Sequence, residues 1–244
     1  MIRRLVKRGL LLGTTVVGLE AAYAILRPSP DLPQFDPSGV FGSPDAPELR
    51  VAALGDSSVT APGVGGPEEI WITLVAERLA ITHHVVLQSF AVGGSMAHNL
   101  VAEQMDEAIL FGPDLVFVSV GANDAIKGVS LRKFAEYLDR LIAELSDTGA
   151  VVVHSGVGDL GTIPRLYPPL STMMTRRSDR FDKAHWEIAA RHGTTVVPHR
   201  SDERALWTDD LALWSSDLFH VSAAGHKRWA DLTWQTVQPL LENV

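Results

Sequence analysis

The sequence predicts an α/β fold in which helices cover both faces of a parallel sheet. Two observations carry this prediction. From residue 50 onward, short apolar runs alternate with longer segments whose apolar residues recur at helical spacing. The chain also has 244 residues, of which 46% are apolar and 20% charged, so it is long enough to bury a sizeable core. Strand–helix alternation at this spacing is typical of parallel sheets with helices on both faces.

The first predicted strand is RVAALG at 50–55, a short apolar run that ends in glycine. Four further strands are predicted at 84–92, 114–121, 150–156 and 194–198. Helices are predicted at 67–80, 95–110, 130–147, 176–192 and 223–241. The predicted domain therefore covers 50–244.

Residues 1–26 differ from the rest of the chain. Four basic residues occur in the first eight positions, and an apolar stretch then runs from Gly9 to Leu26, interrupted by Glu20. This order is typical of a signal peptide or an N-terminal membrane anchor. The positive-inside rule then places the body outside the cytoplasm, so we expect an exported or membrane-anchored protein with membrane contact through this segment. Residues 27–49 hold six prolines and are predicted to form an extended linker.

The charge distribution argues against nucleic acid as a partner. The formal net charge is -8 at pH 7, and residues 1–30 contribute +4, so the remaining residues carry -12. Binding phosphates needs a basic face, which this body lacks. The chain has no cysteine, which excludes disulfides, thiolate catalysis and zinc–thiolate sites. None of this restricts small-molecule substrates.

Polar or glycine-containing turns follow the first three predicted strands. They are GDSS at 55–58, GGS at 93–95 and AND at 122–124. In parallel α/β sheets the ligand site lies beyond the carboxyl ends of the strands. The sequence therefore predicts a functional site at the edge where these turns meet.

The residue types in these turns fit acyl transfer. Asp217 and His220 are three residues apart, and an acid beside a histidine can hold the imidazole in one tautomer and stabilise its charged form. Such a histidine can take the proton of a serine, and Ser57 is the candidate. Acyl transfer also builds negative charge on the carbonyl oxygen, so hydrogen-bond donors must be aimed there. The backbone of Gly94 and the amide of Asn123 are candidates for these donors.

Together the blocks resemble the SGNH (GDSL-type) hydrolase superfamily. The matching blocks are GDS at 55–57, VGGSM at 92–96, GAND at 121–124 and DLFH at 217–220, and they occur in the family's order. The resemblance implies a flavodoxin-like three-layer α/β/α sandwich with a five-stranded parallel sheet. It also implies hydrolysis of a small-molecule or lipid ester or thioester, with no cofactor and no metal.

The same resemblance implies a role for each site residue. Ser57 is the nucleophile, His220 the base and Asp217 the residue that orients it. The backbone N–H groups of Ser57 and Gly94 and the side chain of Asn123 form the oxyanion hole. Two departures stand out: the family often has Leu where this chain has Ser58, and Gly93 competes with Gly94 for the glycine position.

Besides hydrolysis by Ser57, two other interpretations remain open. GGSMA at 93–97 resembles a GxSxG nucleophile elbow with Ala in the last place, which makes Ser95 a rival nucleophile. An α/β-hydrolase normally has more strands before its nucleophile than the two available here. The third interpretation is an envelope-anchored binding module that grips a polar ligand near Ser57 without chemistry.

The segment 157–175 follows the fourth strand and is rich in apolar residues, with three prolines. We expect either a loop that packs on the core or the wall or lid of an acyl pocket.

The remaining polar residues near the site have weaker signals. His98 and His154 are candidates for lining the pocket, whereas His226 is expected to be structural. Asp56 and Asp124 flank the site but receive no role from the sequence. Ser58 is assigned to capping or packing of the segment that follows it.

Overall fold

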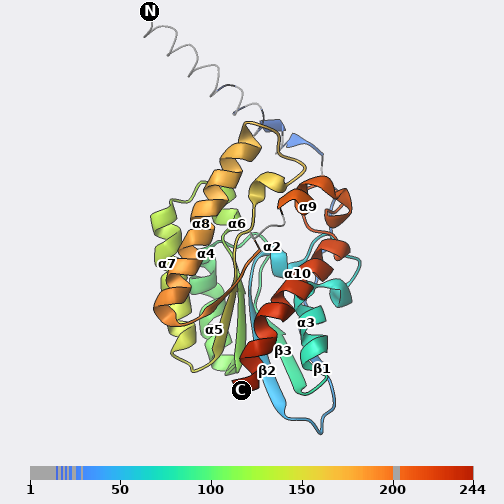
Figure 1. The fold of residues 1–244 in the computed structure, drawn as a ribbon, viewed down its shortest axis with the longest axis vertical. Helices are drawn as coiled ribbons and strands as arrows, with labels where there is room; N and C mark the ends of the chain where they lie inside the picture. The colour runs from blue at the N-terminus through green and yellow to red at the C-terminus, as the bar shows by residue number, and fades with distance from the viewer. Residues whose placement is uncertain are drawn as a thin grey trace, which may run out of the picture.

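The computed structural model describes residues 30–199 and 204–243, together with scattered residues between 15 and 28 (Figure 1). The signal peptide or anchor that the sequence predicts at 1–26 lies largely outside the described residues and stays a prediction. Within the described part of the chain, no helix is both long enough and apolar enough to cross a membrane.

The fold is built on a mixed sheet of six strands. In spatial order these are β1 (Gly39–Phe41), β3 (His84–Ser89), β2 (Glu48–Gly55), β4 (Leu115–Ser119), β5 (Val151–Ser155) and β6 (Thr195–Val197). Strands β2 to β6 are parallel and confirm the five predicted strands.

The prediction of a five-stranded parallel sheet is wrong in one respect, because β1 is an additional strand. It pairs antiparallel with β3, with Val40 opposite Val86, and lies inside the segment that the sequence predicts as an extended linker. An edge strand of three residues is too short to show an alternating apolar pattern, so the prolines and glycines around it dominate the sequence signal.

Helices cover both faces of the sheet, as predicted (Figure 1). On one face lie α3 (Trp71–Leu79) and α10 (Ala223–Val237), and on the other lie α5 (Met105–Phe111), α7 (Leu131–Ser146) and α8 (Leu170–His192). Strand β2 shows why both faces are apolar: Val51 and Ala53 pack towards α3 and α10, whereas Ala52 and Leu54 pack towards α7. Side chains alternate between the faces of a strand, so a strand buried on both sides is apolar throughout.

Several helices differ from their predicted bounds, two of them more than the others. The predicted helix 95–110 is divided into α4 (Ala97–Asn99), a π-helical turn (Leu100–Gln104) and α5. Helix α8 begins at Leu170, directly after Pro169, six residues before the predicted start. The prolines before this point conceal the helical spacing of its first turn.

The parallel strands end together. Gly55 on β2 is opposite Ser119 on β4, and Ser119 is opposite Ser155 on β5. The turns that follow these strands therefore meet at one edge of the sheet, which is where the sequence predicts the site.

Candidate active site

The loop before α10 holds Asp217 and His220 in direct contact. Asp217 Oδ2 lies 2.6 Å from His220 Nδ1. The other carboxylate oxygen of Asp217 accepts hydrogen bonds from the Ser215 hydroxyl at 2.6 Å and from the backbone N–H groups of Phe219 and His220, both at 2.9 Å. Burial alone would raise the pKa of Asp217, but these hydrogen bonds, with that of His220 the strongest, lower it well below its usual range. Asp217 is therefore an ionised acceptor that fixes the His220 ring.

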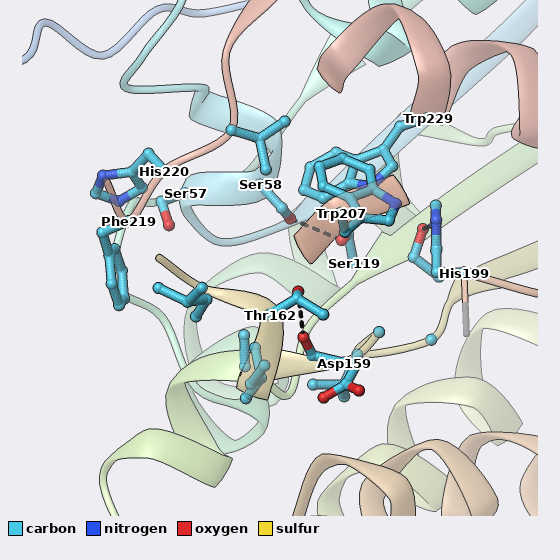
Figure 2. Close-up of a pocket in the computed structure, with 18 of the residues that line it drawn as sticks. Ser57, Ser58, Ser119, Asp159, Thr162, His199, Trp207, Phe219, His220 and Trp229 are labelled. Atoms are coloured by element: carbon cyan, nitrogen blue, oxygen red, sulfur yellow. Dashed lines mark hydrogen bonds between the residues drawn. The ribbon is translucent and has the colours of Figure 1, made fainter. Parts of the chain in front are cut away.

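Ser57 begins the short helix α2 (Ser57–Thr60), which follows β2. The side chain of Asp56 caps this helix by accepting a hydrogen bond from Ser58 N at 2.9 Å. Ser57 and His220 both line two cavities, and Figure 2 shows them at the same end of the larger one. Among the described residues no hydrogen bond joins Ser57 to His220. Such contacts are often long in ligand-free structures and tighten when substrate binds.

The predicted oxyanion-hole residues surround the smaller cavity. It has a volume of about 300 Å³, and Ser57, Gly93, Gly94 and Asn123 are among its lining residues. Gly94 has a φ of +83°, which favours glycine, and a Cβ there would meet no atom within 4 Å. A Cβ at Gly93 would instead meet the side-chain oxygen of Gln34. The backbone conformation at position 94 therefore favours glycine. Position 93 has an ordinary backbone conformation, and a side chain there would meet only the flexible side chain of Gln34.

Asp56, which the sequence leaves without a role, contacts the Asn123 amide. Asn123 Nδ2 donates to Asp56 Oδ2 at 3.0 Å and to the carbonyl of Ser95 at 3.1 Å. Two acceptors on this side fix which end of the amide is the NH₂ group. Burial raises the pKa of the Asp56 carboxyl, although the hydrogen bonds from Ser58 and Asn123 oppose the rise.

Asp124 ties the same turns together at a second point. It is buried, and its Oδ2 accepts a hydrogen bond from Ala97 N at 3.0 Å. Burial raises its pKa as well, against the effect of this hydrogen bond. The turn after β4 is thus joined to the turn after β2 through Asn123, and to the turn after β3 through Asn123 and Asp124.

Gln104 is a supporting residue that the sequence does not reveal. Gln104 lies in the π-helical turn and is buried. Its side chain bonds the N–H and the carbonyl of Gly55: Oε1 accepts from Gly55 N at 2.9 Å, and Nε2 donates to Gly55 O at 3.0 Å. Gln104 therefore fixes the end of β2 immediately before the turn that carries Ser57. The π-helical turn adds one residue to the helix, a feature that is frequent at functional sites. Its sequence signal is only a single glutamine inside an apolar helix.

The larger cavity has a volume of about 580 Å³ and extends from Ser57 and His220 to His199 and Trp229 (Figure 2). The segment 157–175 forms one of its walls through Val157, Leu160 and Ile163. This placement favours the expectation of a pocket wall. The same side chains also contact the core, so the two predicted roles of this segment coincide.

Two histidines that we predict as pocket candidates lie elsewhere. His98 packs its ring against Tyr137, and His154 is buried against His185, with 3.1 Å between their Nδ1 atoms. Neither belongs to the lining of either cavity, so that prediction is wrong. His226 accepts a hydrogen bond from Trp71 N at 3.3 Å, which fits its expected structural role, and it also lines the larger cavity.

The rival nucleophile Ser95 is not in the lining of either cavity. It is buried, and its hydroxyl accepts a hydrogen bond from Gln104 Nε2 at 3.3 Å. A nucleophile needs a base and access to substrate. Ser57 has access through two cavities that it shares with His220, so the geometry favours Ser57.

Comparison with known proteins identifies the family of the chain. The family model of the GDSL-like lipase/acylhydrolase family matches residues 53–228. Esterase TesA of Pseudomonas aeruginosa is 25% identical over 196 residues, which cover 77% of this chain and 87% of that protein.

Solved structures share the fold. The crystal structure of TesA superposes with a TM-score of 0.66 at 21% identity, covering 78% of this chain and 99% of that one. A lipase/acylhydrolase from Enterococcus faecalis superposes with a TM-score of 0.63 at 20% identity, covering 78% of this chain and 96% of that one. The family match includes the turns of Ser57, Gly94 and Asn123 and the Asp217–His220 loop. The chain therefore belongs to the GDSL-like lipase/acylhydrolase family of ester-hydrolysing enzymes.

Proposed function

We propose that this enzyme hydrolyses carboxylic esters, including thioesters, with Ser57 as nucleophile, His220 as general base and Asp217 as the residue that orients His220. The observation that carries the proposal is the 2.6 Å contact between Asp217 Oδ2 and His220 Nδ1, next to a serine that lines the same cavities as the histidine. An ionised Asp217 keeps the proton on His220 Nδ1, so Nε2 is the nitrogen that accepts the proton of Ser57.

The reaction then proceeds in two halves. Ser57 Oγ attacks the ester carbonyl carbon while its proton moves to His220 Nε2, and the carbonyl electron pair moves onto oxygen. The tetrahedral species collapses, and the alcohol or thiol leaves with the proton from His220. Water repeats the sequence on the acyl-enzyme and releases the carboxylic acid and Ser57.

The developing oxyanion is stabilised by donors from three turns. These are the backbone N–H groups of Ser57 and Gly94 and the amide of Asn123. All three residues line the smaller cavity, which supports placing the carbonyl oxygen there. Asn123 Nδ2 already has two acceptors, so it reaches the oxyanion by sharing or releasing one of them.

The acyl group enters the larger cavity. The apolar side chains that line this cavity include Val120, Val157, Ile163 and Phe219. A concave apolar site of this volume suits the hydrocarbon part of an acyl group.

The test is hydrolysis of a short p-nitrophenyl ester by single alanine variants. Ser57→Ala and His220→Ala should each reduce kcat by about 10⁴-fold or more, and the double variant should lose little further, because members of one catalytic unit are not additive. Ser95→Ala is the matched control and should keep most of the activity. Turnover that survives Ser57→Ala and disappears in Ser95→Ala would transfer the nucleophile to Ser95.

A further inference from the structure

The larger cavity contains a pair of hydroxyl groups next to the nucleophile. Ser58 Oγ and Ser119 Oγ lie 2.6 Å apart, and both residues line the cavity (Figure 2). Ser58 directly follows Ser57, and Ser119 is the last residue of β4, the strand beside β2. The pair is therefore within reach of the part of a substrate that lies close to the scissile bond.

The backbone of Ser58 is held so that its hydroxyl has a fixed position. Ser58 N donates to Asp56, and Ser58 O accepts a hydrogen bond from Trp71 Nε1 at 2.8 Å. Ser58 is thus more than a packing residue, since it presents a fixed polar group to the cavity.

Ser119 keeps capacity for another partner. A hydroxyl has one proton and two lone pairs, and the contact with Ser58 uses one of these three. An unsubstituted hydrocarbon chain that covers Ser119 would remove it from water without replacing those hydrogen bonds, which is unfavourable. A substrate group with its own hydroxyl would replace them.

Other polar and aromatic groups surround the pair. In Figure 2 Thr162 lies across the cavity, where its hydroxyl donates to Asp159 O at 2.7 Å, and Trp207 adds an aromatic ring to the lining. The cavity is therefore amphipathic at this point: it offers hydroxyls on two sides and an aromatic surface on a third. Such a surface fits a short substituted chain better than a long plain one.

We propose that the Ser58–Ser119 pair is a specificity subsite for a hydroxyl group on the substrate, and that the preferred substrates are esters of hydroxylated acids. This inference rests on the proposed ester hydrolysis. The shared chemistry is a hydroxyl near the scissile bond, which an ester can carry on its acyl side or on its alcohol side. Because we place the acyl group in the larger cavity, we assign the hydroxyl to the acyl side.

The experiment compares p-nitrophenyl butanoate with p-nitrophenyl 3-hydroxybutanoate. The native enzyme should prefer the hydroxylated ester in kcat/KM by about tenfold, the effect of one good hydrogen bond. Ser119→Ala should abolish the preference, which lowers the ratio of the two kcat/KM values by about tenfold. Ser155→Ala is the matched control, because Ser155 lines the same cavity and pairs in register with Ser119 but bonds His199 instead. The preference should survive in that variant.

A second arm separates the two sources of the hydroxyl. It compares glycerol monoacetate with propyl acetate, which differ only in the hydroxyls of the alcohol. If Ser119→Ala reduces a preference in this arm alone, the subsite stands but binds the alcohol side. If it changes the ratio in neither arm, or if Ser155→Ala reduces the ratio equally, the subsite is contradicted.

Binding to the Ser57→Ala variant, followed by tryptophan fluorescence, repeats the comparison without turnover. A failure of ester hydrolysis itself therefore does not obscure the result. Tighter binding of the hydroxylated ester that Ser119→Ala removes supports the subsite, and equal binding of the two esters contradicts it.

Discussion

At the scale of single residues, the carboxylate of Asp56 determines how Asn123 presents its amide. The 3.0 Å contact between Asn123 Nδ2 and Asp56 Oδ2 fixes which end of the amide is the NH₂ group, and Asn123 lines the smaller cavity, where the proposed oxyanion needs a donor. A reversed amide would present its carbonyl oxygen there and repel the oxyanion. Asp56 is thus a positioning residue for the proposed oxyanion hole.

Asp56→Asn should therefore reduce kcat by about a hundredfold with little change in KM. The new amide can donate as well as accept, so it no longer fixes the orientation of the Asn123 amide, and the effect of one oxyanion donor is lost. Steady-state kinetics of Asp56→Asn, Asn123→Ala and the double variant provide the measurement. The two losses should not add, since both act through the same amide.

Asp124→Asn is the matched control for this cycle. It also loses a buried carboxylate, but one that bonds Ala97 N instead of Asn123. Its effect should add to that of Asn123→Ala. Additive losses for Asp56→Asn would mean that Asp56 acts only on the fold.

The sequence predicts some of these residues and not others, for a physical reason. Asp217 and His220 are neighbours along the chain, so their contact can be read from their spacing. Asp56 and Asn123 are 67 positions apart, and Gln104 reaches Gly55 across 49 positions. Such contacts depend on the register of the strands and on the exact path of several turns, which one sequence does not specify.

At the scale of elements, the segment between β5 and α8 forms one wall of the larger cavity. Leu160 and Ile163 are buried in the core and also line the cavity. A deletion of this segment would damage the core, so single substitutions test its role better.

Ile163→Ala should widen the cavity and shift the preference of the enzyme towards longer acyl chains by about tenfold in relative kcat/KM, since each methylene in an apolar pocket changes specificity by roughly this amount. A series of p-nitrophenyl esters from acetate to dodecanoate measures the shift. Leu110→Ala is the control, because Leu110 is exposed on α5 and outside both cavities. An unchanged profile in Ile163→Ala would show that the acyl chain does not contact this wall.

Helices and strands could be predicted where the periodic pattern of apolar residues extends over enough positions. All five parallel strands and the helices that cover them follow from apolar spacing, whereas the short strand β1 and the first turn of α8 do not. Both lie beside prolines, and a segment of three to six residues carries too little periodicity to outweigh that local signal.

At the scale of the whole molecule, buried histidines make the fold sensitive to acid. His154, His185 and His226 are almost fully buried. Burial lowers the pKa of His185 to about 4 and that of His226 to about 3, and it lowers the pKa of His154 further still. They form neutral contacts, such as the 3.2 Å hydrogen bond from His185 Nε2 to Val120 O.

The unfolded chain should therefore take up protons below pH 6.5 that the folded chain does not. Stability that is fully present above pH 6.5 should fall by about 1.4 kcal/mol per pH unit for each such histidine as the pH drops towards 4. The raised pKa values of Asp56 and Asp124 act in the opposite direction, so the net slope is smaller. Urea denaturation at pH 7.5 and at pH 5.5 measures the change. Equal or greater stability at pH 5.5 would mean that these histidines are not held neutral by the fold.

The central claim is that Ser57 is an activated nucleophile, and covalent labelling tests it most directly. A fluorophosphonate probe reacts with a serine only when a base activates it. Mass spectrometry of the labelled native protein should locate the adduct on the peptide that contains Ser57. The Ser57→Ala variant should take up no label, and Ser95→Ala should label like the native protein. An unlabelled native protein, or an adduct on Ser95, would contradict the account.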